Sequence, residues 1–166
     1  MKARIDNPVL TIPGALQAMQ AFNGSAEGQG VPQETITLVQ LRTSQINGCH
    51  VCVGLHCSIL RKVGVTDQHL DAVANWRESR EFSPAERAAL ALTEEVTRLA
   101  DRPDAVPDEV WDEAARHYDE RALSALLIGI AATTVFNLLN VAVRQPAVSE
   151  NQIAELAAHG VRGLPQ

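Results

Sequence analysis

The residues best able to do chemistry lie close together, in the stretch from residue 44 to residue 57. This stretch reads Ser-Gln-Ile-Asn-Gly-Cys-His-Val-Cys-Val-Gly-Leu-His-Cys and contains all three cysteines and two of the five histidines. Two residues separate Cys49 from Cys52, and His56 follows Cys52 by four. A nucleophilic thiol beside a second thiol supports reversible redox chemistry, in which a sulfenic acid forms first and a disulfide replaces it.

A helix must position these groups. Asn47-Gly48 predicts the turn that begins the helix, and Gly64 predicts its end. Each helical residue turns the chain by about 100°, so Cys49, Cys52 and His56 should share one face. The site should therefore occupy one side of the helix, at its N-terminus.

This placement has electrostatic consequences for the thiols. The unpaired N–H groups and the dipole at a helix N-terminus favour an anion, so the pKa of Cys49 should be depressed. Cys52 lies about one turn deeper and gains less, but His56 could accept its proton or stabilise its thiolate. Cys57 points about 140° away from Cys52, so we expect a packed, inert thiol there.

Periodicity and capping signals predict the elements around this helix. Residues 1–12 should form an extended arm, 23–30 a loop and 101–107 a second loop. No segment alternates at period two for long enough to form a strand, so the fold should be all-α. The predicted helices, besides the one that follows Asn47-Gly48, cover residues 13–22, 33–46, 66–77, 83–100, 107–117, 120–144 and 149–159.

The longest predicted helix has an unusual composition. It carries no charged residue from Ala122 to Val143, which is long enough for a membrane span. Its polar residues and the amphipathic helices around it instead favour a buried central helix. Thr133, Asn137 and Asn140 line one face of this helix, and we expect their side chains to hydrogen-bond to neighbouring helices. The alternative is that these three side chains line the thiol site.

Composition excludes several classes of function. The chain has 166 residues, which fits a single domain, and 46% are hydrophobic. The net charge of −6 and the lack of a basic cluster argue against a nucleic-acid partner. The N-terminal residues lack an apolar signal segment, so the thiols should lie in a reducing cytoplasm, with no membrane partner.

Glu94 and Glu95 are expected on a solvated helix face.

A family resemblance rests on this same stretch. The run Leu41-Arg42-Thr43-Ser44-Gln45-Ile46-Asn47-Gly48-Cys49, followed by Cys52, His56 and Arg61-Lys62-Val63-Gly64, resembles the core of the alkylhydroperoxidase AhpD-like proteins. These belong to the carboxymuconolactone decarboxylase superfamily. The resemblance implies an AhpD-like helical bundle over residues 1–166, with its core at 34–144 and the Cys-x-x-Cys pair at the start of a central helix.

The resemblance also implies an activity, with roles for three residues. Cys52 would be the peroxidatic thiol, Cys49 the resolving thiol and His56 a member of the proton relay in the reduction of organic hydroperoxides, without a cofactor or metal. A dithiol protein of the lipoyl or thioredoxin-like kind would restore the thiols. The family assembles as dimers, trimers or hexamers, and we expect a homo-oligomer here.

Two positions depart from the family pattern. Active family members carry a glutamate twelve residues before the first cysteine, where this chain has Thr37. Glu34 lies about 4.5 Å away along the same helix, so it is a candidate substitute. The best peroxidases have a histidine just before the second cysteine, where this chain has Val51, and His50 occupies the other middle position. We therefore consider Glu34, Thr37 and His50 as candidates for the proton relay.

Four alternatives to a peroxidase remain open, and the simplest is that Cys49 and Cys52 are a structural or vestigial pair. Cys49, Cys52 and His56 could hold zinc, although a tetrahedral site usually draws its ligands from two elements. A cofactor-free decarboxylase acting on ring lactones shares the implied fold but lacks the cysteine pair. A redox-responsive module without turnover would carry the same cysteines, and hydroperoxide consumption distinguishes it from a peroxidase.

Overall fold

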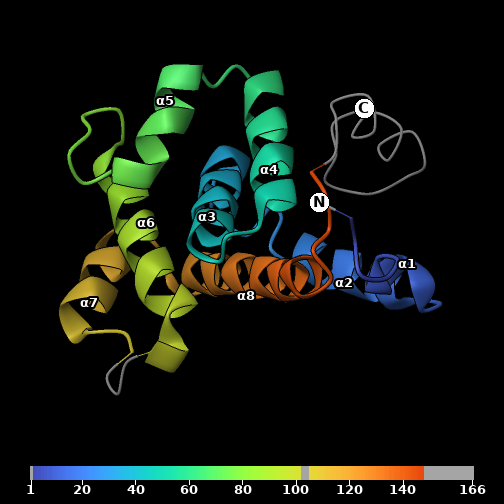
Figure 1. The fold of residues 1–166 in the computed structure, drawn as a ribbon. Helices are drawn as coiled ribbons and strands as arrows, with labels where there is room; N and C mark the ends of the chain where they lie inside the picture. The colour runs from blue at the N-terminus through green and yellow to red at the C-terminus, as the bar shows by residue number, and fades with distance from the viewer. Residues whose placement is uncertain (1, 102–104, 148–166) are drawn as a thin grey trace.

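The computed structural model describes residues 2–101 and 105–147, and these residues form an all-helical bundle without a strand (Figure 1). This confirms the predicted fold class, with the Cys-x-x-Cys pair at the start of an inner helix. The elements are α1 (Pro8–Thr11), α2 (Ala15–Gly24), α3 (Gln33–Ile46), α4 (His50–Lys62), α5 (Asp67–Ala72), η1 (Val73–Asn75), α6 (Pro84–Thr97), η2 (Leu99–Asp101), α7 (Asp108–His117) and α8 (Glu120–Ala142).

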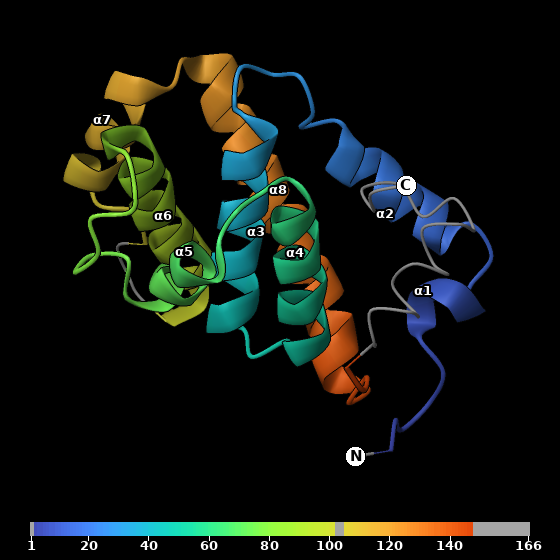
Figure 2. The same cartoon turned by 90° about the horizontal axis from the view of Figure 1, so that it is seen from above.

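α3 lies at the centre of the bundle and packs against α4, α6 and α8 (Figures 1 and 2). Two hydrophobic clusters meet on it. Ile36 and Val39 belong to a cluster shared with α6, α7 and α8, and Leu38 and Leu41 belong to one shared with α4, α5 and α6. Because both sides of α3 are covered, most of the polar residues beyond its first two positions are also buried, and the Thr43 hydroxyl donates to the carbonyl of Val39 one turn earlier.

The capping signals fix the starts of α5 and α6 and the end of α4 as predicted, although the helix predicted over residues 66–77 divides into α5 and η1 and the one predicted over 83–100 ends at Thr97. The Ser83 hydroxyl accepts a hydrogen bond from the Glu86 amide, and the Glu86 carboxylate accepts one from the Ser83 amide, which completes a capping box. The Thr66 hydroxyl caps α5 by accepting from the His69 amide. Gly64 ends α4 at φ +96°, a conformation that favours glycine.

The predicted extended arm over residues 1–12 is wrong in part, because it contains the short helix α1. The Asn7 side chain accepts a hydrogen bond from the Val9 amide, and Pro8 occupies the first helical position. The predicted helix over residues 149–159 lies outside the residues that the structure describes.

α8 is buried along one side and exposed along the other. Among the described residues it is the one helix long and apolar enough to cross a membrane by length and composition, and half of its most apolar window is buried in the bundle. It packs against α2, α3, α4, α6 and α7. Its exposed side carries Val135, Leu138 and Val141, so α8 acts as a core helix that leaves an apolar stripe uncovered by the described residues.

The prediction that Glu94 and Glu95 lie on a solvated face is wrong. Glu94 is only 4% exposed and Glu95 is also buried. The Glu94 carboxylate accepts hydrogen bonds from Arg42 on α3 and from Arg77 and Trp76 after η1. Burial alone would raise the pKa of Glu94, but these bonds outweigh it and lower the pKa. Glu94 therefore joins α3, α6 and the turn after η1 through one buried carboxylate.

Candidate active site

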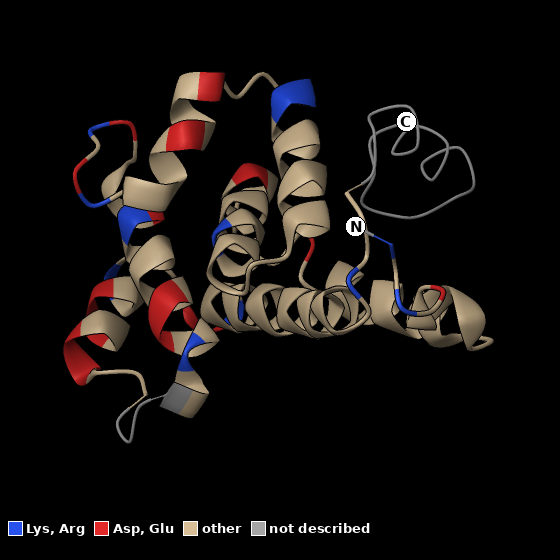
Figure 3. Ribbon diagram, in the orientation of Figure 1, with Lys and Arg blue, Asp and Glu red and all other residues tan. Residues whose placement is uncertain are grey.

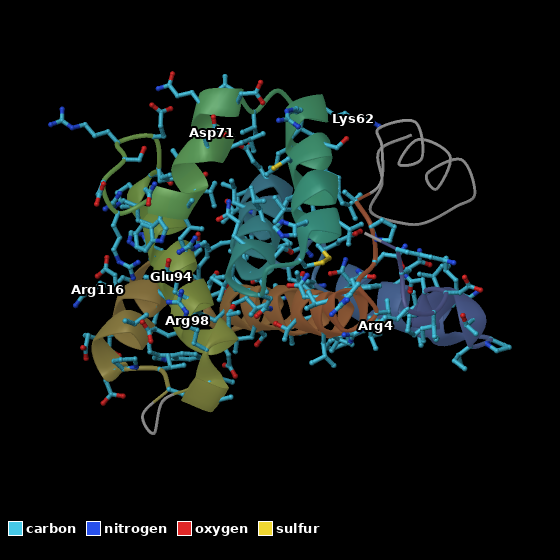
Figure 4. All side chains as sticks on the ribbon, in the orientation of Figure 1. Arg4, Lys62, Asp71, Glu94, Arg98 and Arg116 are labelled. Carbon is cyan, nitrogen blue, oxygen red and sulfur yellow. A yellow bond between two sulfur atoms is a disulfide. The ribbon has the colours of Figure 1, made fainter. Side chains whose placement is uncertain are left out.

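The turn between α3 and α4 brings the two cysteines together. Gly48 adopts φ +67°, a left-handed conformation that favours glycine, and the Cys49 amide donates a 3.0 Å hydrogen bond to the Ser44 carbonyl. Cys49 then caps α4, and it forms a disulfide with Cys52 across a Cα–Cα distance of 5.3 Å. Figure 4 shows the disulfide at the base of α4, next to α8.

A cavity of about 400 Å³ opens beside Cys52. Its wall includes two residues of α4, Cys52, which is 5% exposed, and His56, which is 9% exposed. Both lie on the same side of α4 because His56 follows Cys52 by four positions, as the sequence predicts. The remaining lining residues come from α2 and the loop after it, from α3, from α8 and from the rest of α4: Leu16, Gln20, Asn23, Glu27, Gln33, Thr37, Gln40, Leu55, Ile59, Val63, Thr133, Phe136, Asn137 and Asn140.

His56 is neutral in this setting. Burial lowers its pKa to about 4, because the charged imidazolium would lose its hydration. Its Nδ1 atom is buried and has no hydrogen-bond partner among the described residues. At neutral pH the imidazole, whose side chain lines the cavity, therefore has one nitrogen without a partner among the described residues, able to donate or accept according to the tautomer.

Asn140 on α8 contacts the thiol site directly. Its amide nitrogen donates a hydrogen bond to the Cys52 sulfur at 3.4 Å. Its amide oxygen accepts a 3.1 Å hydrogen bond from the Asn7 side chain, which fixes the orientation of the amide. Asn7 and Asn140 thus extend the site beyond α4.

Asn137 ties three elements together one turn earlier on α8. Its amide nitrogen donates to the Ser44 hydroxyl at 3.1 Å, and its amide oxygen accepts from the Asn47 side chain at 3.1 Å. Asn137 and Asn140 also line the cavity. The polar face of α8 therefore does what we predicted, since it ties helices together, and it also fulfils the alternative, since it lines the thiol site.

The three candidate relay residues lie in different places. Thr37 lines the cavity and is buried, and its hydroxyl donates to the Gln33 carbonyl at 2.9 Å. Glu34 is exposed in the first turn of α3, outside the cavity. His50 is exposed beside Cys49, also outside the cavity. Only Thr37 therefore lies in the same cavity as Cys52 and His56.

The cavity wall formed by α2 and the following loop did not emerge from the sequence. Gln20, Asn23 and Glu27 line the cavity, and Asn23 accepts a 2.8 Å hydrogen bond from Gln40 on α3. The spacing of Leu16, Gln20, Asn23 and Glu27 is that of one helical face. That spacing indicates that these side chains lie on one side of the segment, but it does not show that this side borders a cavity.

Cys49 borders a second hollow, of about 390 Å³, that Cys52 does not line. Its wall combines Cys49 and His50 with the end of α8 and the residues after it, including Arg144 and Pro146. Asn140 lines both hollows. The two cysteines of one disulfide therefore line different spaces.

The remaining thiol and the candidate metal ligands complete the description. Cys57 is partly buried against the cluster around Leu60, and burial raises the pKa of its thiol, as expected for an inert cysteine. The described part of the chain contains no group of three or more His, Cys, Asp or Glu side chains placed to hold a metal ion. With Cys49 and Cys52 joined to each other, the paired sulfurs support thiol–disulfide chemistry.

An all-helical bundle with a Cys-x-x-Cys pair opening an inner helix and a histidine one turn later defines the AhpD-like class of fold. The chain belongs to the carboxymuconolactone decarboxylase family, which its residues 13–95 match.

The chain is similar to known proteins, in sequence and in structure, over most of their length. YdfG of Bacillus subtilis (strain 168), an uncharacterized protein, is 31% identical over 83% of this chain and 92% of its own. The crystal structure of ATU0492 from Agrobacterium tumefaciens, of unknown function and proposed to be an antioxidant defence protein AhpD, superimposes with a TM-score of 0.82. It is 30% identical over 90% of this chain and all of its own. The debrominase Bmp8 has a TM-score of 0.70 at 24% identity, over 82% of this chain and 73% of its own, which shows the fold alone.

Proposed function

We propose that this protein is a thiol-dependent peroxidase of the AhpD-like alkylhydroperoxidase type, which reduces organic hydroperoxides in antioxidant defence. One observation carries the proposal. Cys52 and the neutral His56 line one cavity, whereas Cys49, which is already bonded to Cys52, borders a separate hollow. A substrate and a reductant could therefore reach the two sulfurs from different sides.

The cycle has three balanced steps. The Cys52 thiolate attacks the terminal oxygen of ROOH, the O–O bond breaks, and with one proton the products are the Cys52 sulfenic acid and ROH. The Cys49 thiol attacks the sulfenic sulfur, so the disulfide forms and water leaves. A dithiol then attacks the Cys49 sulfur and is itself oxidised to a disulfide, which returns both cysteines to thiols. The net reaction converts ROOH and a dithiol into ROH, water and a disulfide.

Two side chains assist the first step. The Asn140 amide, which donates to the Cys52 sulfur, stabilises the developing thiolate. His56 is neutral and has an unpartnered nitrogen, and we assign it to a relay that passes the thiol proton on to the departing alkoxide without storing it, because burial disfavours the imidazolium. Thr37 cannot support His56 as the family glutamate would. General acid–base help is worth about 10²–10⁴-fold, and we expect slow turnover for this reason.

The reductant is a dithiol protein of the lipoyl or thioredoxin-like kind, which acts in the cytoplasm. It approaches the hollow beside Cys49, where His50 and Arg144 are neighbouring side chains. The protein assembles as a homo-oligomer through the exposed apolar stripe of α8, since burying Val135, Leu138 and Val141 against a second copy removes apolar surface from water.

The test is steady-state consumption of cumene hydroperoxide with dithiothreitol as reductant. Wild type should turn over, Cys52→Ser should be inactive, and Cys49→Ser and His56→Ala should be strongly impaired. If wild type forms the Cys49–Cys52 disulfide but consumes no more hydroperoxide than Cys52→Ser, the protein is a redox-responsive module and the peroxidase proposal is wrong.

A further inference from the structure

The cavity beside Cys52 is poor in charge. Of the described residues that line it, Glu27 is the only one with a charged side chain, because His56 is neutral and the others are amides, threonines, apolar residues and the disulfide-bonded Cys52. None is lysine or arginine. The ribbon of α4 and α8 is correspondingly uncharged along most of its length in Figure 3.

Two cations in the neighbourhood, Lys62 and Arg4 (Figure 4), lie outside the cavity. Lys62 is at the opposite end of α4 from the disulfide (Figure 4). The Arg4 guanidinium donates to the carbonyl of Ala142 at the end of α8. Neither lines the cavity. A negatively charged ligand beside Cys52 would therefore find no described cation in contact with it.

The cavity has an exposed end and a buried end. Glu27, Gln33 and Val63 are exposed lining residues, whereas Cys52 and Asn137 are buried lining residues, so we infer that the cavity opens on the side of the exposed ones. The Glu27 carboxylate therefore belongs to the solvent-exposed part of the lining, on the side from which a ligand can enter.

The wall also offers uncharged hydrogen-bonding groups. The Gln20 amide nitrogen and the His56 Nδ1 atom are both buried, and neither has a partner among the described residues. Buried polar atoms of this kind are rarely left unpaired, and because both side chains line the cavity, a change of rotamer would let a ligand supply the missing bonds. A hydroperoxide group can do so, because its O–H donates and its oxygens accept.

We propose that the cavity selects uncharged organic hydroperoxides over those that carry a carboxylate, and that Glu27 at the opening is a specificity-determining residue. This inference rests on the proposed peroxidase function, since it names the class of substrate for the same site. It also places carboxylated ring lactones in the rejected class.

The physical reason is the cost of burying an anion without a partner. A carboxylate that enters the cavity gives up hydration and gains no ion pair in exchange. It is repelled by Glu27 on entry and, in the reduced protein, by the Cys52 thiolate at the inner end. An uncharged alkyl or aryl hydroperoxide avoids both costs and buries its apolar part against Leu55, Ile59 and Phe136.

The experiment measures binding to the oxidised protein, so that no turnover is needed. The probes are 2-phenyl-2-propanol, which is the alcohol left by cumene hydroperoxide, and its analogue with a carboxylate at the para position of the ring. Titration calorimetry gives both dissociation constants for wild type, Glu27→Lys and Glu78→Lys. Glu78 is an exposed loop residue outside the cavity, so Glu78→Lys makes the same change in net charge elsewhere.

We expect wild type and Glu78→Lys to bind the alcohol at least tenfold more tightly than the carboxylate, and Glu27→Lys to reduce this preference at least fivefold. Equal or tighter binding of the carboxylate by wild type, or no binding of either probe, would overturn the inference. A preference unaffected by Glu27→Lys would overturn the role of Glu27. An intact preference without hydroperoxide turnover would contradict only the proposed peroxidase function.

Discussion

The side-chain amide of Asn140 donates a hydrogen bond to the sulfur of Cys52 at 3.4 Å, across 88 residues of sequence. The same amide accepts from Asn7. The reactive end of α4 is therefore positioned by α8 and by the N-terminal segment as well as by its own turn. The hydrogen bond from Asn140 should therefore affect the acidity of the Cys52 thiol in the reduced protein.

Loss of this bond should make the Cys52 thiol less acidic. A hydrogen bond to a charged group contributes about 1.5–3 kcal/mol, so Asn140→Leu should lower the thiolate fraction of reduced Cys52 at neutral pH about tenfold. The measurement is the rate of iodoacetamide alkylation as a function of pH, with mass spectrometry assigning the label to each cysteine. Cys57 is the internal control, and an unchanged rate at Cys52 would show that the bond does not stabilise the thiolate.

Burial of neutral His56 should make stability depend on pH. Its pKa falls from 6.5 in the unfolded chain to about 4 in the folded protein, so the unfolded state binds more protons between these values. The resulting stability is complete above pH 6.5 and is lost as the pH falls towards 4. We expect the free energy of unfolding of the oxidised protein to fall by about 2 kcal/mol from pH 7 to pH 5 because of this residue.

Urea titration at several pH values tests this expectation. The His56→Gln variant does not titrate at this position and should show a smaller fall over the same range. An identical pH dependence in the variant would mean that the folded protein accepts the imidazolium without penalty.

The Glu94 carboxylate should contribute strongly to the stability of the fold. Glu94→Gln leaves the largely buried Arg42 guanidinium without its anion, and breaking a buried pair from one side costs about 3 kcal/mol. Chemical denaturation measures the loss. Asp67→Asn breaks the exposed Arg61–Asp67 pair and should have little effect, so an equal loss in both variants would contradict this role for Glu94.

The exposed stripe of α8 should mediate self-association. Light scattering coupled to size exclusion should give wild type a mass that is a multiple of 17.9 kDa, and Leu138→Glu should shift it towards the monomer. Leu138 is 67% exposed, and Leu99, which is 52% exposed on η2, provides a matched control. Leu99→Glu should keep the wild-type mass, whereas a monomeric wild type would refute the assembly.

Much of the fold could be predicted because the deciding signals are local. Ser83 with Glu86, Thr66 and Gly64 each determine a helix end through contacts within a few residues. The spacing of Cys52 and His56 likewise places both on one side of α4 without any knowledge of the rest of the chain.

The errors involve contacts between distant residues. Glu94 looks like a surface residue until Arg42, 52 positions earlier, is placed against it. The role of Gln20 and Glu27 depends on where α2 docks against α8, which helical periodicity alone does not determine. The short helix α1 was missed because a single capped turn has almost no periodicity to detect.

The most direct test of the central claim identifies the sulfur that reacts first. Reduced Cys49→Ser is mixed with one equivalent of cumene hydroperoxide and dimedone, and the labelled cysteine is identified by mass spectrometry. We predict that dimedone labels the sulfenic acid of Cys52 in Cys49→Ser and that no cysteine is labelled in Cys52→Ser. In wild type, each hydroperoxide consumed should yield one Cys49–Cys52 disulfide and one alcohol. Rapid labelling of Cys49 in Cys52→Ser, with Cys52 unlabelled in Cys49→Ser, would contradict the proposed mechanism.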